Sequence, residues 1–168
     1  MPRNIILVGL LLLCVMLSAP SAAAKIGAMG GFGPYWVKGD NFVGLAVTGY
    51  VDILGLGLDL SPTVGFWTGT VFDVRLTDVT PAFAFKYNFA TPGAQFAPYV
   101  GFAPALHFWF ASGQSETYLG IYALGGVAIN ISRRTQMPIQ IDFGFIFAEG
   151  RTVNTFIAKI GLATEMQR

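Results

Sequence analysis

The amino-acid sequence predicts an all-β protein: an eight-stranded antiparallel up-and-down transmembrane β-barrel that follows a cleaved signal peptide. The chain is 54% hydrophobic and only 11% charged, whereas a soluble domain has about 25% charged residues. Its N-terminus has the pattern of an export signal, and the rest alternates large apolar residues with small or polar ones. Such a chain cannot cover itself with a polar surface, so we expect its outer surface to face lipid.

The first 24 residues have the parts of a secretory signal peptide. Arg3 supplies a positive charge, residues 5–17 form an uninterrupted apolar segment, and Ala22, Ala23 and Ala24 are small residues that suit a signal peptidase. The apolar segment is shorter than the ~20 residues of a typical membrane-spanning helix. We therefore expect residues 1–24 to be removed and residues 25–168 to form one barrel domain, a retained N-terminal anchor being the alternative.

Removal of the signal peptide also removes Cys14, the single cysteine, and Arg3. The mature chain then has no thiol chemistry, and nine Lys and Arg balance nine Asp and Glu, because one of the ten basic residues is lost. A chain without net charge has no basic patch to attract nucleic acid. We expect no nucleic-acid partner, no metal site and no cofactor.

A period of two runs through the chain after Lys25, as is typical of strands with two unlike faces. Between Phe96 and Phe110 the even positions are Phe, Pro, Val or Leu, and the odd positions are Ala, Gly, Tyr, His or Trp. The same alternation recurs along the chain. It predicts strands at residues 25–35, 42–52, 54–66, 76–89, 96–110, 116–131, 137–148 and 153–164, with both termini at one end.

The charged residues lie on the face that carries Gly and Ala, and the side chains of that face are too small to make an apolar core. We therefore expect the Phe- and Ile-rich face to contact lipid, in a barrel that closes because lipid satisfies no backbone polar group. The alternative is a soluble periplasmic barrel that binds a small apolar ligand with its Phe-rich face inward. A polytopic helical protein is disfavoured, because each candidate span is interrupted by Gly residues or by Pro98, Pro104, Asp52 or Asp59.

Aromatic residues gather near the ends of the predicted strands, as in the girdles where rings meet lipid headgroups. The set expected at one interface is Trp36, Phe66, Trp67, Phe108, Phe110, Phe145 and Phe147, and the set at the other is Tyr87, Phe89 and Phe96.

The segments Pro81–Phe89 and Ala97–Ala105 read PAFAFKYNF and APYVGFAPA. A strand that ends in Tyr-x-Phe, followed by Pro-Tyr-Val-Gly, resembles a hairpin of the small outer-membrane β-barrel family that includes OmpX and the OmpA membrane domain. The resemblance implies a bacterial outer-membrane location and insertion by the outer-membrane assembly machinery. Lys159 and Gly161 fit the polar-x-Gly part of that family's C-terminal signal, but Thr164 and Met166 stand where aromatic residues are expected.

An eight-stranded barrel is just wide enough for its own side chains, so we expect a filled lumen rather than an open pore. The alternation assigns nine polar or titratable residues to it: Asp52, Asp59, Lys86, His107, Tyr118, Tyr122, Asn130, Asp142 and Lys159. We expect Asp142, Lys159, Lys86, His107, Tyr118 and Tyr122 to form a structural polar cluster. Asp142 and Lys159 should pair across the last hairpin, because a buried charge needs a partner.

His107 is the single histidine and the best candidate for chemistry. It fits the base of a lipid A acyl-chain hydrolase or transferase, which also needs a neighbouring hydroxyl nucleophile. Trp109 stands where a His-x-Ser motif would place that hydroxyl, and Ser112 and Glu116 lie farther on. We therefore expect His107 to be hydrogen-bonded to Tyr118 or Tyr122 in the lumen.

The short segments between the predicted strands exclude large ligand-binding loops. The sequence as a whole predicts a non-enzymatic outer-membrane barrel with a structural or envelope-integrity role. Its expected partners are the lipid bilayer and the assembly machinery, and a further protein partner is left open. The lipid-modifying enzyme and the soluble ligand-binding barrel are the alternatives.

Overall fold

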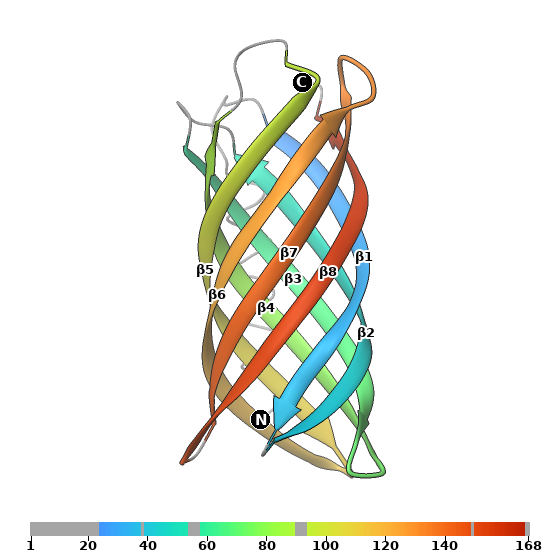
Figure 1. The fold of residues 1–168 in the computed structure, drawn as a ribbon, viewed down its shortest axis with the longest axis vertical. Helices are drawn as coiled ribbons and strands as arrows, with labels where there is room; N and C mark the ends of the chain where they lie inside the picture. The colour runs from blue at the N-terminus through green and yellow to red at the C-terminus, as the bar shows by residue number, and fades with distance from the viewer. Residues whose placement is uncertain (1–23, 38, 54–57, 90–93, 149, 167–168) are drawn as a thin grey trace.

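The computed structural model describes residues 24–37, 39–53, 58–89, 94–148 and 150–166, which form a closed antiparallel barrel (Figure 1). Each strand pairs with its neighbours in sequence. The strands are β1 (Ala24–Val37), β2 (Asp40–Ile53), β3 (Leu58–Val71), β4 (Val74–Asn88), β5 (Phe96–Ala111), β6 (Gln114–Asn130), β7 (Thr135–Ala148) and β8 (Arg151–Glu165).

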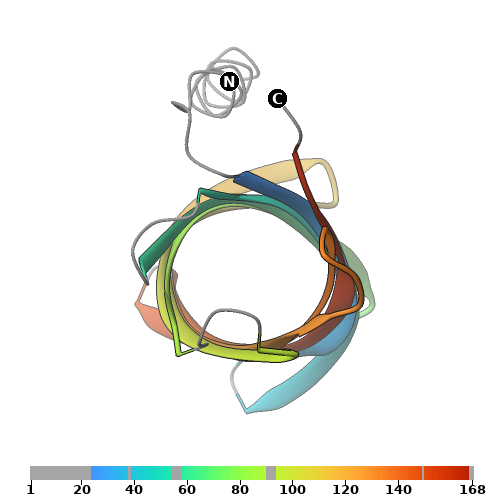
Figure 2. The ribbon, with the colours of Figure 1, turned by 90° about the horizontal axis from the view of Figure 1, so that it is seen from above.

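The first and last strands close the ring, as the view along the barrel shows (Figure 2). β1 pairs with β8 from Lys25 opposite Glu165 to Trp36 opposite Asn154. Closure leaves no strand edge with unpaired backbone groups, which is the condition for crossing a membrane with strands. The fold class predicted from the sequence is confirmed.

The predicted signal peptide lies outside the described residues except for Ala24, with which β1 begins. Its removal and the domain boundary after Ala24 stay predictions. In the ranges that the structure describes, no helix is long and apolar enough to cross a membrane.

The two ends of the barrel differ. At the lower end in Figure 1, four hairpins close with only two residues between strands, at positions 38–39, 72–73, 112–113 and 149–150. Phe72 and Asp73 have φ of 47° and 63°, and Ser112 and Gly113 have 47° and 79°. Positive φ at both central residues is typical of the type I′ turn, whose twist matches that of the strands. We call this the turn end, and the opposite end, which carries the strand ends Ala24 and Glu165, the terminal end.

The prediction for the third strand was wrong at its C-terminal end. The span 54–66 was expected, but β3 runs from Leu58 to Val71, and residues 54–57 lie outside the described part of the chain. No break between β3 and β4 is visible in the sequence, because their turn, Phe72–Asp73, lies between Val71 and Val74 and carries neither Gly nor Pro. The other strands lie within a few residues of the predicted spans.

The large apolar residues face outward, as Phe102 at 51% exposure and Phe147 at 55% illustrate. The charged residues assigned to the lumen face inward, as Lys86 and Asp142 at 6% exposure illustrate. The alternative of a soluble barrel with its Phe-rich face inward is therefore wrong. The assignment of Trp67 to the aromatic girdle is also wrong. Trp67 is 2% exposed and lies in the lumen, because its neighbour Phe66 takes the outward position in the alternation.

Candidate functional site: the barrel lumen

The turn end of the lumen is filled by an apolar cluster, which we call the plug. Its centre is a stack of Tyr35 on Trp67, with ring centroids 4.2 Å apart, and Trp109 lies 6.3 Å from Tyr35. Trp67 donates a hydrogen bond from Nε1 to the Gly33 carbonyl at 3.2 Å. The plug consists of the buried residues Tyr35, Val37, Ala46, Trp67, Leu76, Trp109, Ile146, Ala148, Val153 and Ile157. The plug thus places ten buried side chains in the lumen at the turn end.

Five of the rings in the lumen fit because each lies over a glycine. A Cβ added at Gly44 or at Gly69 would collide with the Trp67 indole, and one added at Gly144 would collide with the Tyr122 ring. The same holds for Gly27 under Tyr50, Gly126 under Tyr99 and Gly120 under His107. The glycines on the small-residue face thus provide the width that a narrow barrel needs to hold bulky rings.

Next to the plug lies a buried polar node centred on Asp78. Its Oδ2 lies 2.6 Å from His107 Nδ1 and accepts a hydrogen bond from the Tyr35 hydroxyl at 2.7 Å, while Oδ1 accepts one from Thr80 at 3.1 Å. On the other side of the imidazole, the Tyr122 hydroxyl lies 3.4 Å from Nε2. Asp78 and His107 are both completely buried. The node therefore satisfies its polar atoms internally, as burial requires.

The node does not have the geometry of a nucleophile–base–acid triad. The Thr80 hydroxyl and the Asp78 carboxylate both approach the same imidazole nitrogen of His107, Nδ1. The other nitrogen, Nε2, is the one that would activate a nucleophile in such a triad, and it faces the Tyr122 hydroxyl instead of an aliphatic hydroxyl. Ser112, the hydroxyl considered from the sequence, is exposed in the β5–β6 turn. The interior position of His107 also separates it from the lipid-facing surface. Of the two tyrosines considered from the sequence, Tyr122 faces Nε2.

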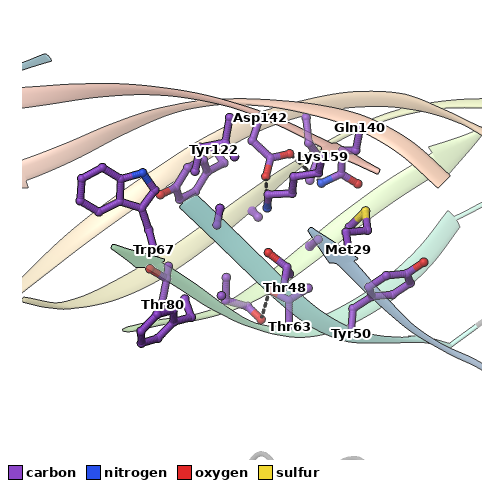
Figure 3. Close-up of a pocket in the computed structure, with 18 of the residues that line it drawn as sticks. Met29, Thr48, Tyr50, Thr63, Trp67, Thr80, Tyr122, Gln140, Asp142 and Lys159 are labelled. Atoms are coloured by element: carbon purple, nitrogen blue, oxygen red, sulfur yellow. Dashed lines mark hydrogen bonds and ion pairs between the residues drawn. The ribbon is translucent and has the colours of Figure 1, made fainter. Parts of the chain in front are cut away.

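Farther toward the terminal end, the lumen holds two ion pairs. Lys159 Nζ lies 2.5 Å from Asp142 Oδ2, so the pair expected from the sequence is present (Figure 3). The register places Asp142 opposite Ile157, so the pair is diagonal rather than direct. Gln140 donates a further hydrogen bond to Asp142 at 2.6 Å.

The second pair joins Lys86 to Asp52 at 2.7 Å. Lys86 Nζ also lies 4.7 Å from the centre of the Tyr50 ring and 5.6 Å from that of Tyr99, in cation–π contacts. Ser61 donates a hydrogen bond to the Asp52 carboxylate. Lys86 is thus held by one carboxylate and two ring faces.

Side chains from opposite walls surround a small cavity between the node and these pairs. Asp142, Lys159 and Gln140 approach it from one side and Thr48 and Thr63 from the other (Figure 3). Its volume is about 60 Å³, below the ~150 Å³ of a cavity that takes benzene and the ~300 Å³ of a small ligand pocket. The space suits a few water molecules.

The remaining residues assigned to the lumen lie near its ends. Tyr118 packs edge-on against Trp109, with centroids 4.9 Å apart, and donates to Glu116. Asp59 accepts a hydrogen bond from Asn88, and Asn130 donates to the Ala94 carbonyl at 2.5 Å. The expected residues therefore form several separate groups along the lumen, rather than one cluster.

Asp78 and Tyr35, which are central to the node, were not among the residues predicted from the sequence. Asp78 lies two residues after the predicted start of the fourth strand, and Tyr35 lies at the predicted end of the first. Tyr35 has an odd sequence number, as Gly31 and Gly33 do, and this place in the alternation was the signal that its side chain faces inward. Among the described residues, no group of three or more His, Cys, Asp or Glu side chains could hold a metal ion.

No protein-family model matches the chain, and no curated protein matches it in sequence. Solved structures do. Neisserial surface protein A (NspA) superposes with a TM-score of 0.73 at 13% identity, covering 85% of this chain and 97% of that one. A major outer-membrane protein of Thermus thermophilus gives 0.55 at 16% identity, covering 85% and 99%.

The attachment invasion locus protein Ail of Yersinia pestis gives a TM-score of 0.54 at 10% identity, covering 86% of this chain and 99% of that one. Identities this low establish the fold alone, and that fold is the one implied by the resemblance noted in the sequence. The chain is a small eight-stranded β-barrel of the outer-membrane type.

Proposed function

We propose that this protein is a non-enzymatic, non-conducting barrel of the bacterial outer membrane that contributes to the mechanical and permeability integrity of the envelope. The plug supports this proposal. Its tyrosine, tryptophans and aliphatic residues pack together in the lumen at the turn end, and a packed apolar layer opposes the passage of ions and polar solutes. The two-residue turns offer no long loop for binding a receptor.

Insertion by the outer-membrane assembly machinery belongs to the same proposal. The outward-facing apolar residues on every strand supply the surface that a bilayer needs. The lipid-modifying alternative is weaker, because His107 is buried in the lumen with Asp78 and Tyr122 rather than beside lipid.

The first experiment is heat-modifiability of the mature protein in membrane fractions. A band that resists carbonate extraction and shifts on boiling is the expected result, because closed barrels stay folded in detergent until heated. A soluble band with no shift would overturn the membrane assignment. Purified protein in planar bilayers should then give no discrete conductance steps, and loss of the protein from cells should increase uptake of a detergent or a large hydrophobic dye.

The enzyme alternative is tested on the same material. Labelled lipid A is incubated with the folded protein and with a His107→Gln variant. Turnover by the first and not by the second would contradict the non-enzymatic proposal.

A further inference from the structure

The ladder between β4 and β5 is interrupted halfway along the barrel. Residues 80–84 of β4 lie across from residues 103–107 of β5, and of these positions only Ala82 is paired, with Ala105. The same two strands pair without a gap with their other neighbours, β3 and β6. The interruption therefore belongs to the boundary between β4 and β5, which we call the β4–β5 seam, and not to either strand.

Two prolines account for the interruption. Pro81 of β4 and Pro104 of β5 both lie within it, and the register places them across from residues 106 and 83. Proline has no N–H and cannot donate to the ladder, and lipid does not replace a missing donor. Shorter gaps accompany the single prolines Pro34, Pro62 and Pro138 in other ladders. The β4–β5 seam is thus the place in the wall where two strands part at least cost.

The inner side of the seam carries small side chains. Ala82, Ala84, Ala103 and Ala105 face the lumen, and each is at most 6% exposed. The first three also line the lumen cavity. Because an alanine side chain ends at Cβ, separation of the two strands at this point would join the cavity to the bilayer.

The outer side of the seam is apolar. Phe83 is 38% exposed. The Phe85 and Phe102 rings stack across the seam at one edge of the interruption, with centroids 5.0 Å apart. A hydrocarbon chain therefore meets an apolar surface up to the point at which the strands part.

The cavity behind the seam offers hydrogen-bond donors. Its charged lining consists of Lys86, Lys159 and Asp142, with a positive excess. Lys159 and Thr48 point into the cavity from opposite walls (Figure 3). An ammonium has three N–H donors, and Asp142 accepts one of those of Lys159. Thr48 is 5% exposed, and its hydroxyl has no hydrogen-bond partner among the described residues. Buried donors of this kind require an acceptor.

The size of the cavity limits the acceptor. A volume of about 60 Å³ holds a group as large as a few water molecules, such as a carboxyl group. The phosphodiester and glycerol of a phospholipid are too large for it. A gap between two strands admits one alkyl chain at most. The fitting molecule has a small anionic head and a single chain.

We propose that the lumen cavity binds the carboxyl group of a free fatty acid, whose alkyl chain passes through the β4–β5 seam into the bilayer. The carboxylate accepts hydrogen bonds from Lys159 and Thr48 in place of water. The alanines on the inner side of the seam contact the chain where it crosses the wall. This site goes beyond the proposed function and requires only that the barrel lies in a bilayer.

The test is photolabelling of the folded protein in bilayer nanodiscs. The probe is palmitic acid with a diazirine next to its carboxyl group, and the labelled residues are identified by mass spectrometry. Label is expected on lumen-facing residues of the cavity wall, Ala82, Ala103 and Leu124. A phospholipid whose acyl chain carries the same diazirine should label only outward-facing residues, such as Phe83 and Phe102.

The role of the head is tested with Thr48→Val, which removes a hydroxyl at nearly constant volume and unchanged charge. Lumen labelling at a limiting probe concentration should fall about fivefold, as expected for the loss of one hydrogen bond. Thr152→Val is the matched control, because Thr152 is exposed on β8, and it should label as the wild type does. Equal labelling of the Thr48→Val variant and the wild type would contradict the proposed binding of the carboxylate.

The role of the seam is tested with a disulfide. Pro81→Cys and Leu106→Cys place two thiols opposite each other on the outer face of the seam. Oxidation should abolish lumen labelling by the fatty acid, and reduction should restore it. The control pair is Phe102→Cys with Ala123→Cys, which lie opposite each other in the uninterrupted β5–β6 ladder. Oxidation of this pair should leave lumen labelling unchanged.

Each variant is first checked for the heat-shifted band, so that loss of the barrel is separated from loss of the site. Lumen labelling that is equal in the oxidised and reduced seam variant would show entry from the end of the barrel and overturn the seam as the route. Equal lumen labelling by the phospholipid would overturn the fatty-acid assignment. Absence of lumen label in an inserted wild-type barrel would overturn the site and leave the proposed function intact.

Discussion

The imidazole of His107 lies directly over Gly120 on the neighbouring strand, so that a Cβ at position 120 would be 2.6 Å from Nε2. This contact joins the small-residue face of β6 to the polar node, because the ring reaches Asp78 and Tyr122 in the space that a side chain at position 120 would occupy. The glycines of the lumen wall are therefore part of the site.

Replacing Gly120 by Ala should destabilise the barrel by about 1–3 kcal/mol, because the methyl group forces His107 away from its partners. The measurement is denaturant unfolding of the folded protein in lipid vesicles. Gly30→Ala is the matched control, since a Cβ there meets nothing within 4 Å. Equal destabilisation by the two substitutions would contradict the packing of rings on glycines.

The node should behave as a coupled unit. Asp78→Ala removes the acceptor of Tyr35, His107 and Thr80 together, and we expect a loss of about 3–5 kcal/mol of unfolding free energy. The double variant Asp78→Ala, His107→Ala should cost less than the sum of the two single changes. Strict additivity in the same unfolding assay would show that the two side chains stabilise the barrel independently.

The Asp142–Lys159 pair gives a prediction about charge burial. Lys159→Ala alone should cost about 3–5 kcal/mol, because it leaves the Asp142 carboxylate in the lumen without its ammonium partner. The double replacement of both residues by Leu should cost much less, because neither charge then remains. The comparison is made by urea unfolding in vesicles, and single Ala variants as stable as the wild type would disprove the coupling.

Opening the plug should convert the closed barrel into a narrow channel. Trp67→Ala with Trp109→Ala removes the largest plug side chains, at a cost of about 3–5 kcal/mol each. Conductance steps should appear in planar bilayers, with preference for cations, because the described lumen contains Asp52, Asp59, Asp78 and Asp142 against Lys86 and Lys159.

The control for this experiment is Phe143→Ala, which removes an outward-facing ring of β7. It should fold and remain non-conducting. Persisting closure of the double tryptophan variant, while its band still shifts on heating, would show that the plug is not the barrier.

The barrel, its strand number and its lipid face could all be predicted from the order of the amino acids. Alternation is a local property, so Phe102 and Phe143 on one face and Lys86 and Asp142 on the other follow from position parity. The prediction failed at Trp67, which was assigned to the aromatic girdle although its position in the alternation places it in the lumen. It also failed at the end of β3, because the type I′ turn formed by Phe72 and Asp73 contains no Gly or Pro.

Which lumen residues meet depends on the three-dimensional arrangement of the strands. Tyr35 and Asp78 are 43 residues apart on β1 and β4, and Lys86 and Asp52 lie on strands separated by β3. Contacts across the lumen depend on strand tilt and on the stagger of the register around the ring, which alternation leaves undetermined. Pairing within one hairpin, as for Asp142 and Lys159, could be predicted because a two-residue turn fixes the register of its own two strands.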